Sequence, residues 1–126
     1  MPDTLQHING TPVLVCAADG EPVHGERDAT DLIGEAFHHD ASWIAIPADR
    51  FEDDFFRLHT RVAGEIVQKF ANYRLRVAIV GDISRHTAAS SALRDFVRES
   101  NRGTQLWFVS DTEALRDRLG PAPANG

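Results

Sequence analysis

The feature that most constrains the fold is a set of four short segments that are apolar at every position. They are Val13–Ala17, Trp43–Ile46, Val77–Val80 and Leu106–Val109. Each is too short for a helix and lacks the polar alternation of a half-exposed strand, so each is typical of a strand buried on both faces. Such strands belong to mostly parallel sheets covered by helices. We therefore expect these segments to lie side by side in a covered sheet, with their trailing loops as the working edge.

A hairpin is expected to add a fifth strand at the N-terminus. Asn9-Gly10 lies between the extended run Thr4–Ile8 and the apolar run that starts at Val13. The Asn-Gly pair favours a two-residue turn between antiparallel strands. The predicted fold class is α/β, a single domain with a mostly parallel five-stranded sheet, an N-terminal hairpin and four helices. The order of the strands is not readable from the pattern.

Apolar residues three and four positions apart predict the helices between the strands. Asp28 is a suitable N-cap for the first helix. The expected buried stripe of that helix is Ala29, Leu32, Ile33, Ala36 and Phe37. The segment Ser84–Ser90 is expected to be a loop before the third helix. Ser110 and Glu113 are expected to form a capping box for the last helix, which runs through Leu119.

The longest predicted helix runs from Asp54 to Phe70 and ends near Asn72. At about 1.5 Å per residue it would be roughly 25 Å long, enough to cross the sheet. Gly64 lies inside it, and a glycine within a helix costs about 1 kcal/mol relative to alanine. We expect close approach of another backbone to compensate, either within the chain or across a homodimer.

Length and charge exclude several classes of protein. The 126 residues fit one domain, 1–120, and a chain of this size buries roughly two thirds of its unfolded surface without disulfides or metal. The tail 121–126 has nothing to bury and is expected to fray. Lysine and arginine number 13 against 19 aspartates and glutamates, a net charge of −6. That balance weighs against nucleic-acid binding, because phosphate contacts need a basic face.

Three features missing from the sequence bear on the cellular compartment: a membrane span, a signal peptide and a second cysteine. No apolar run approaches the roughly 20 residues that span a bilayer, and the first ten residues lack the layout of a signal peptide. Cys16 is the single cysteine, which excludes an intrachain disulfide and a zinc site built from cysteines. We expect a cytoplasmic protein with no membrane partner and no cofactor, in which Cys16 is an inert core residue.

Several motifs in the second half of the chain resemble one bacterial family. They are Asp54–Thr60, Ala63–Phe70, Asn72–Arg74, Ala78–Asp82, Asp95–Phe96 and Glu99–Gly103. Together they are similar to the bacterial domain of unknown function 4180, from roughly Asp54 to Val109 and more weakly through the N-terminal half. The resemblance implies a compact bacterial α/β domain. The family has no established activity, so the resemblance implies no catalytic residues.

A looser resemblance rests on the order of the elements alone. A hairpin followed by alternating helices and strands is similar to the STAS domain of anti-sigma-factor antagonists, which are small acidic cytoplasmic proteins that bind kinase-like partners. In those domains a regulatory serine stands at the start of the helix after the third strand. Here that place is Glu52–Phe56, which has no serine. The usual control by phosphorylation is therefore not expected.

Ligands of open α/β sheets gather beyond the carboxyl ends of the parallel strands, so the residues there are candidates for a site. They are Asp49, Arg50, Asp82, Ser84, His86, Ser110 and Asp111. Asp82, Ser84 and His86 supply an acid, a hydroxyl and an imidazole, the groups of a nucleophilic site. Three polar residues in one short loop seldom converge on one substrate atom, however, and Gly-Asp after a strand commonly forms a turn.

The acidic run Asp49, Glu52, Asp53 and Asp54 has two interpretations. With Asp82 it can hold Mg²⁺, as a phosphoacceptor pocket does. Acidic residues before a helix also complement the helix dipole by roughly 0.3–1 kcal/mol each, which explains the run without a metal. The only lysine, Lys69, lies far from the strand ends, which argues against a phosphate-binding loop.

Histidines and arginines give weaker signals. His38 and His39 are adjacent, whereas zinc pairs on helices prefer a spacing of four, so no metal site is expected. Arg57, His59, Thr60 and Arg61 flank the apolar stripe of the long predicted helix and can bind an anion. Alternatively, Arg57 and Arg61 form its solvated face, since Arg61 and Glu65 are one turn apart. A modest basic cluster is made by Arg74, Arg76, Arg98 and Arg102.

Two function hypotheses follow. The first is a non-catalytic regulatory module of STAS-like type that binds a protein partner through Asp49–Arg61. The alternative is a small-molecule-binding protein or enzyme with a pocket at Asp82, Ser84 and His86. A folded companion that stabilises a neighbouring gene product is a third interpretation, which the residues do not separate from the first.

Overall fold

The computed structural model describes residues 3–120, so the tail 121–126 lies outside the described residues. The strands are β1 Thr4–Ile8, β2 Thr11–Val15, β3 Trp43–Pro47, β4 Arg76–Val80 and β5 Leu106–Val109. The α-helices are α1 Glu26–His38, α2 Asp53–Phe56, α3 Val62–Asn72, α4 Ser84–Ala89, α5 Ser91–Arg102 and α6 Thr112–Leu119. Two 3₁₀ turns are η1 Ala48–Arg50 and η2 Leu58–Thr60. The mixed α/β class and the N-terminal hairpin are thereby confirmed.

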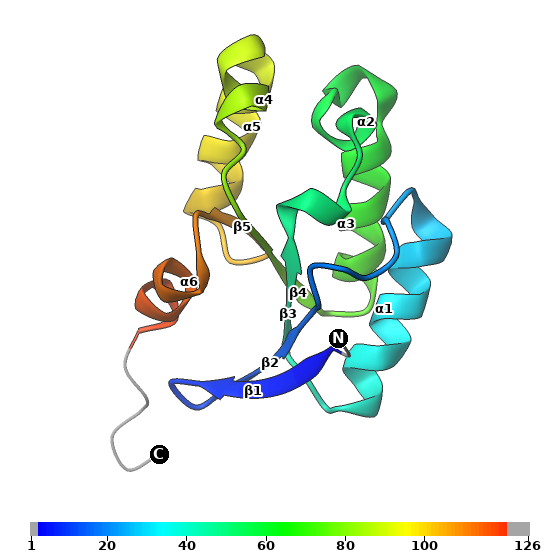
Figure 1. Ribbon diagram of the computed structural model, residues 1–126, viewed down its shortest axis with the longest axis vertical. Coiled ribbons are helices and arrows are strands. Elements are labelled where there is room, and N and C mark those ends of the chain that lie inside the picture. The colour runs from blue at the N-terminus through cyan, green and yellow to red at the C-terminus, as the bar shows by residue number, and fades with distance from the viewer. Residues whose placement is uncertain (1–2, 121–126) are drawn as a thin grey trace.

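The five strands form one sheet in the order β1-β2-β3-β4-β5 (Figure 1). β1 pairs antiparallel with β2, and β2 to β5 run parallel to one another. Because consecutive strands are neighbours, right-handed crossovers place every connecting helix on the same face of the sheet. The expectation that the four apolar segments lie side by side is confirmed.

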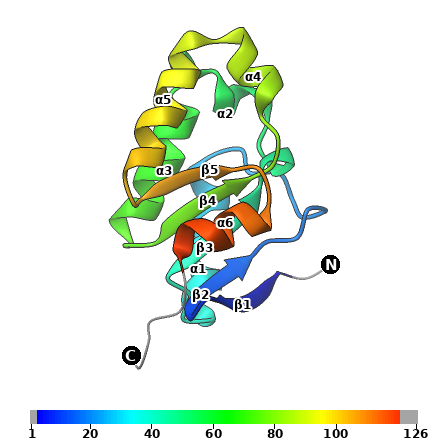
Figure 2. The ribbon, with the colours of Figure 1, turned by 90° about the vertical axis from the view of Figure 1, so that its left-hand side faces the viewer.

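The two faces of the sheet are covered unequally. The larger core joins α1, α3 and α5 to the face that carries Leu14, Ile44 and Ile79. The smaller core joins Leu115 of α6 to the face that carries Trp43 and Trp107. Figure 2 shows α6 alone on its side of the sheet among the described helices. Within residues 3–120, no helix has both the length and the apolar character needed to cross a bilayer.

The predicted helix 54–70 is wrong as a continuous element. α2 ends at Phe56, η2 follows, and α3 begins at Val62. The Thr60 hydroxyl donates to the carbonyls of Asp54 and Arg57, both at 2.7 Å, and accepts from the Val62 amide at 3.3 Å. These bonds replace the helical ladder, and Arg61 adopts a left-handed backbone with φ +67°. The apolar spacing continues across the break because both pieces face the same core.

Gly64 does not have the expected close neighbour. A Cβ placed on it would meet nothing within 4 Å, so it faces open space and not another backbone of this chain. Phe37 was expected in the core but is 50% exposed, with its ring edge against Tyr73 at a centroid distance of 5.9 Å. The buried stripe of α1 is therefore Ala29, Leu32, Ile33 and Ala36.

Two predicted caps are wrong and one predicted loop is a helix. Gly25 stands at the N-cap of α1, while the Asp28 carboxylate reaches back to accept from the His24 amide at 2.8 Å. α6 is capped by Asp111, which accepts from the Ala114 amide at 2.8 Å, one residue later than predicted. The expected loop 84–90 contains α4, so the described chain has more helices than the four predicted.

Candidate functional site

The sheet order decides where a ligand can sit. In doubly wound sheets the ligand crevice opens where the strand order reverses and helices leave on opposite faces. β2 to β5 follow one another without a reversal. The loops at the carboxyl ends of these strands instead enclose separate hollows, an acidic pocket beside α1 and a cleft between two pairs of helices.

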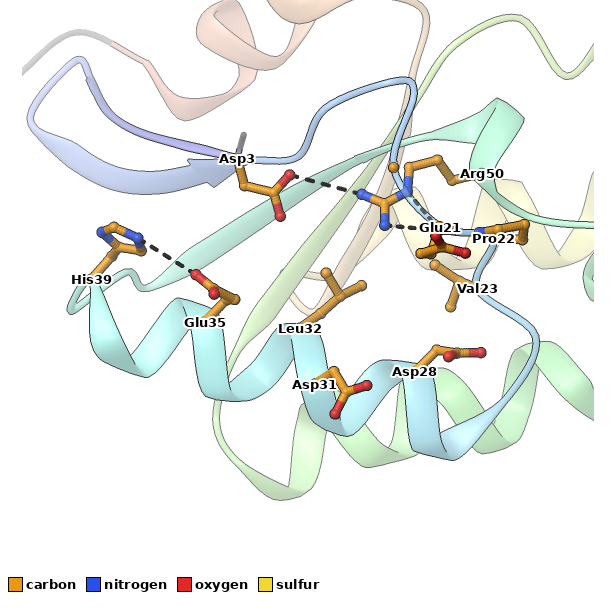
Figure 3. A pocket seen from close by; sticks show the side chains of 11 residues that line it. Asp3, Glu21, Pro22, Val23, Asp28, Asp31, Leu32, Glu35, His39 and Arg50 are labelled. Atoms are coloured by element: carbon orange, nitrogen blue, oxygen red, sulfur yellow. Dashed lines mark hydrogen bonds and ion pairs between the residues drawn. The ribbon is translucent and has the colours of Figure 1, made fainter. Parts of the chain in front are cut away.

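The acidic pocket lies between β1, the loop after β2, and α1 (Figure 3). Its volume is about 640 Å³. It is lined by Asp3, Gly20, Glu21, Pro22, Val23, Asp28, Asp31, Leu32, Glu35, His39 and Arg50. His39 lies 3.6 Å from Glu35 one turn earlier on α1, and five of the lining residues carry a carboxylate against the one guanidinium of Arg50. The pocket therefore has a markedly negative lining.

Arg50 is the organising residue of this pocket. Its side chain is buried, and its Nε and Nη2 donate to the Glu21 carbonyl at 3.0 and 2.8 Å. Nη1 donates to the Ala17 carbonyl at 3.3 Å and lies 4.0 Å from the Asp3 carboxylate. Because these acceptors belong to the loop after β2, one guanidinium ties that loop to the end of β3. These hydrogen bonds show that Arg50 positions the loop after β2. In the sequence, Arg50 stands out only as a residue that follows a strand.

Cys16 lies next to this network and has an unreactive thiol. Burial, reinforced by the negative charge of Asp3, raises the pKa of its thiol to about 12. A thiol with such a pKa stays protonated near neutral pH, and the protonated form is a poor nucleophile and metal ligand. This finding supports the prediction that Cys16 is an inert core residue.

Each acid of the run Glu52–Asp54 has its own cationic or histidine partner. Glu52 contacts Nδ1 of His24, Asp53 lies 3.4 Å from Arg85, and Asp54 lies 3.7 Å from Arg57. The three carboxylates thus have three different partners. Among the described residues no group of three or more His, Cys, Asp or Glu side chains is arranged to hold a metal ion. Asp49 is exposed on η1, away from these pairs.

The second hollow, which we call the interarm cleft, lies along α2, η2 and α3 and is bordered by residues of α4 and α5 and by Glu26 at the start of α1. Its polar half, of about 560 Å³, is lined by Asp53, Phe56, Arg57, Leu58, His59, Arg85, His86, Ala89, Ser90 and Ala92. Its apolar half, of about 620 Å³, is lined by Glu26, Leu58, Arg61, Gly64, Glu65, Gln68 and Phe96. Leu58 lines both halves. Figure 1 shows α2 and α3 as one helical arm and α4 and α5 as another.

An aromatic stack forms one wall of the polar half. The imidazole of His86 lies flat on the ring of Phe56, with a centroid distance of 4.0 Å and an interplanar angle of 13°. Partial burial, assisted by the positive charge of Arg85, lowers the pKa of His86. His86 is therefore neutral at pH 7, with a hydrogen-bonding ring beside the guanidinium groups of Arg57 and Arg85.

Asp82, Ser84 and His86 have separate structural roles. The Asp82 carboxylate accepts from the Ser84 amide at 2.8 Å and so begins α4. That bond, with one from the Ser84 hydroxyl, lowers the pKa of Asp82. Among the described residues, no hydrogen bond joins Ser84 to His86 or His86 to Asp82. The three side chains do not form a proton relay.

The structure thus brings together part of the candidate set. Asp53, Arg57, His59 and His86 line the polar half of the interarm cleft. Asp54 is tied to Arg57 from outside it, and Asp49, Asp82 and Ser84 do not line it. Gly64, Arg85 and Phe96 line the cleft but were not expected there. The only signal for Gly64 was its improbable place within a helix.

Comparison with known proteins places the chain in a family without assigning an activity. No curated protein and no solved structure matches it. Residues 8–119 match the family described as domain of unknown function DUF4180. The match covers most of the chain, including every residue that lines the interarm cleft. The chain therefore belongs to the DUF4180 family.

Proposed function

We propose that this protein is a non-catalytic interaction module that binds an extended segment of a partner protein in the interarm cleft. The observation that carries the proposal is that Leu58 lines two neighbouring hollows, one lined by arginine and histidine and the other by Gly64 and Phe96. Such a hollow suits a chain segment with an apolar side chain followed by an acidic one.

The size of the cleft favours a polypeptide over a compact small molecule. Pockets for small molecules usually enclose about 300–1,000 Å³. The polar half holds about 560 Å³ and the apolar half about 620 Å³, so each half alone is within that range and a ligand that contacts both must span two hollows. A ligand that filled both halves would be elongated, as a peptide segment is.

The charges of the cleft indicate how a segment would be oriented. The polar half is lined by the guanidinium groups of Arg57 and Arg85 and by the carboxylate of Asp53, while the Asp54 carboxylate that pairs with Arg57 is not part of its lining. The apolar half carries Glu65 and Glu26 at its edge with Arg61. An acidic residue of the partner is therefore favoured at the polar half, and its apolar neighbour against Leu58 and Phe96.

The chemistry of the cleft supports binding more than catalysis. Of its two imidazoles, that of His86 is occupied in a stack with Phe56, and its guanidinium groups, those of Arg85 and Arg57, pair with Asp53 and Asp54. The N-terminal hairpin followed by parallel strands with helices between them is compatible with the STAS-like analogy, and we include a STAS-like bacterial regulatory role in this proposal. The buried, protonated thiol of Cys16 suits a reducing cytoplasm, and we include a cytoplasmic location in it.

Gly64 offers a test that does not disturb the fold. Gly64→Gln adds a long side chain to the apolar half, and a Cβ there meets nothing within 4 Å. Gly34→Gln is the matched control, since Gly34 is also inside a helix with open space around it and does not line the cleft. Both changes are expected to raise the free energy of unfolding by about 0.5–1 kcal/mol, because glycine is a poor helix former.

The measurement is affinity capture of the tagged full chain from its native host, with quantitative mass spectrometry and a binding assay on the purified partner. We expect the wild type and Gly34→Gln to retain the same partner and Gly64→Gln to lose it. Equal retention by both variants would refute the cleft as the binding face. Thermal stabilisation of the wild type by a metabolite, with no protein captured, would replace this proposal with the small-molecule alternative.

A further inference from the structure

A second hollow lies at the opposite end of the sheet, outside the interarm cleft. It opens at the amino ends of β3 and β4, beside the C-terminal end of α6, and has a volume of about 370 Å³. We call it the Trp–Arg pocket. It is lined by Gly10, Thr11, Pro12, Ser42, Trp43, Arg76, Thr104, Trp107, Arg118 and Leu119.

Two adjacent tryptophan rings, tilted by 38° to one another, lie beside two arginines at this pocket. The rings of Trp43 and Trp107 have centroids 4.4 Å apart and are 2% and 7% exposed. The guanidinium carbon of Arg118 lies 4.3 Å from the Trp107 centroid, and that of Arg76 lies 6.0 Å from the Trp43 centroid. Arg76 is also the register partner of Trp43 across β3 and β4. The rings therefore fix two flat cations at the mouth of the hollow.

The charge of this pocket is the reverse of that of the chain. The chain has a net charge of −6, yet none of the ten lining residues is acidic. Within residues 3–120, no carboxylate lies within 4 Å of the guanidinium of Arg76 or Arg118; Arg118 donates to the Asn101 carbonyl at 2.6 Å. Arg98 and Arg102 differ, since they pair with Asp95 and Glu99 on their own helix. Most N–H donors of Arg76 and Arg118 thus remain free.

We propose that the Trp–Arg pocket binds the oxyanion group, a carboxylate or a phosphate, of a small polar metabolite. Guanidinium groups match both oxyanions through paired N–H donors, and the bonds are strengthened by charge. The hydroxyls of Thr11, Ser42 and Thr104 line the same hollow and suit the uncharged polar part of such a ligand. The volume lies at the lower end of the range for small-molecule sites, about 300–1,000 Å³.

The tryptophans make the proposal directly measurable. Trp43 and Trp107 are the only tryptophans of the chain, so intrinsic fluorescence reports on this pocket and not on the interarm cleft. Wild-type protein is titrated with inorganic phosphate and, separately, with succinate, at constant ionic strength set with chloride. We expect a saturable change with at least one anion, and the two titrations distinguish a phosphate site from a carboxylate site.

Variants separate ligand binding from a purely structural covering of the tryptophans. Arg76→Gln and Arg118→Gln are each expected to weaken the anion affinity at least about ten-fold, because each removes charge-assisted hydrogen bonds. Arg98→Gln and Arg102→Gln are matched controls and are expected to leave the affinity unchanged. Calorimetric titration provides a readout that does not depend on the fluorescence of Trp107, and circular dichroism checks that each variant folds.

Two results would overturn the proposal. The first is no saturable response of the wild type to either anion. The second is the same affinity in Arg76→Gln and Arg118→Gln as in the two controls, which would mean that the arginines serve only to cover the tryptophan rings.

Discussion

The contact between Gly20 and Arg50 makes a quantitative test of the acidic pocket. A Cβ added at Gly20 would lie 2.5 Å from the guanidinium carbon of Arg50 and 2.7 Å from both of its terminal nitrogens. Non-bonded carbon atoms prefer about 3.5–4.0 Å, so the guanidinium would have to move by about 1 Å. Gly20 has no left-handed backbone angle, and alanine therefore meets an obstacle of space alone.

The loss of stability expected for Gly20→Ala follows from the contacts that hold the Arg50 guanidinium in place. Arg50 is 8% exposed and donates to the carbonyls of Glu21 and Ala17 at 2.8–3.3 Å. A shift of about 1 Å takes these bonds beyond the usual limit of about 3.2 Å. Hydrogen bonds to charged groups contribute about 1.5–3 kcal/mol, and overpacking costs about 1–3 kcal/mol. We therefore expect Gly20→Ala to lower the free energy of unfolding by about 2 kcal/mol.

A double-mutant cycle with Arg50→Ala checks the cause. Arg50→Ala alone is expected to cost about 3 kcal/mol, since it leaves the two carbonyls and Asp3 without their cation. In that background Gly20→Ala has no guanidinium to displace and is expected to cost nothing. The coupling free energy is then about 2 kcal/mol, within the range of about 0.5–3 kcal/mol for residues in contact.

Urea unfolding followed by circular dichroism measures all four proteins. Additive penalties, with the double variant equal to the sum of the single ones within about 0.5 kcal/mol, would refute the argument that Arg50 is the obstacle.

Two further predictions concern α6 and the buried thiol. Asp111→Ala is expected to lower the free energy of unfolding by about 1 kcal/mol through loss of the α6 cap, while Ser110→Ala stays within about 0.5 kcal/mol; equal effects in urea unfolding would contradict the assignment of Asp111. Cys16 has a pKa of about 12 in the folded protein against an ordinary value of 9.0, so the unfolded chain releases its proton first and stability falls as the pH rises above 9. This alkaline slope should be smaller in Cys16→Ala, and native Cys16 should resist alkylation at pH 8 until urea is added.

Much of the architecture could be predicted from local patterns. The segments around Ile44, Val77 and Phe108 are strands because their uniform apolar character suits a sheet with both faces covered. The turn at Asn9-Gly10 adopts positive φ at both residues, as the dipeptide favours. Each of these features depends on residues adjacent in the sequence, which is why the sequence pattern was sufficient to predict it.

The break between α2 and α3 and the N-caps of the helices were harder to predict, because several side chains compete for the same backbone hydrogen bonds. Apolar spacing gave no sign of the interruption at Thr60 and Arg61, since α2 and α3 present their apolar residues to one core. Ser110 and Asp111 are both good capping residues, and the choice between them depends on the backbone direction as the chain leaves β5. Such choices differ by about 1 kcal/mol, which tertiary packing readily overrides.

The candidate sites required contacts that only the fold creates. Asp53 meets Arg85 across 32 positions of sequence, and Arg76 meets Arg118 at a pocket built from four strand ends and a helix. Patterns of neighbouring residues were enough to predict the strands, the hairpin and the family, and composition was enough for the acidic balance. The cleft beside α2 and α4 and the arginines beside the two tryptophans could be found only from the folded chain. The physical reason is that burial acts on each residue locally, whereas the convergence of charged side chains depends on strand order, which no stretch of residues encodes alone.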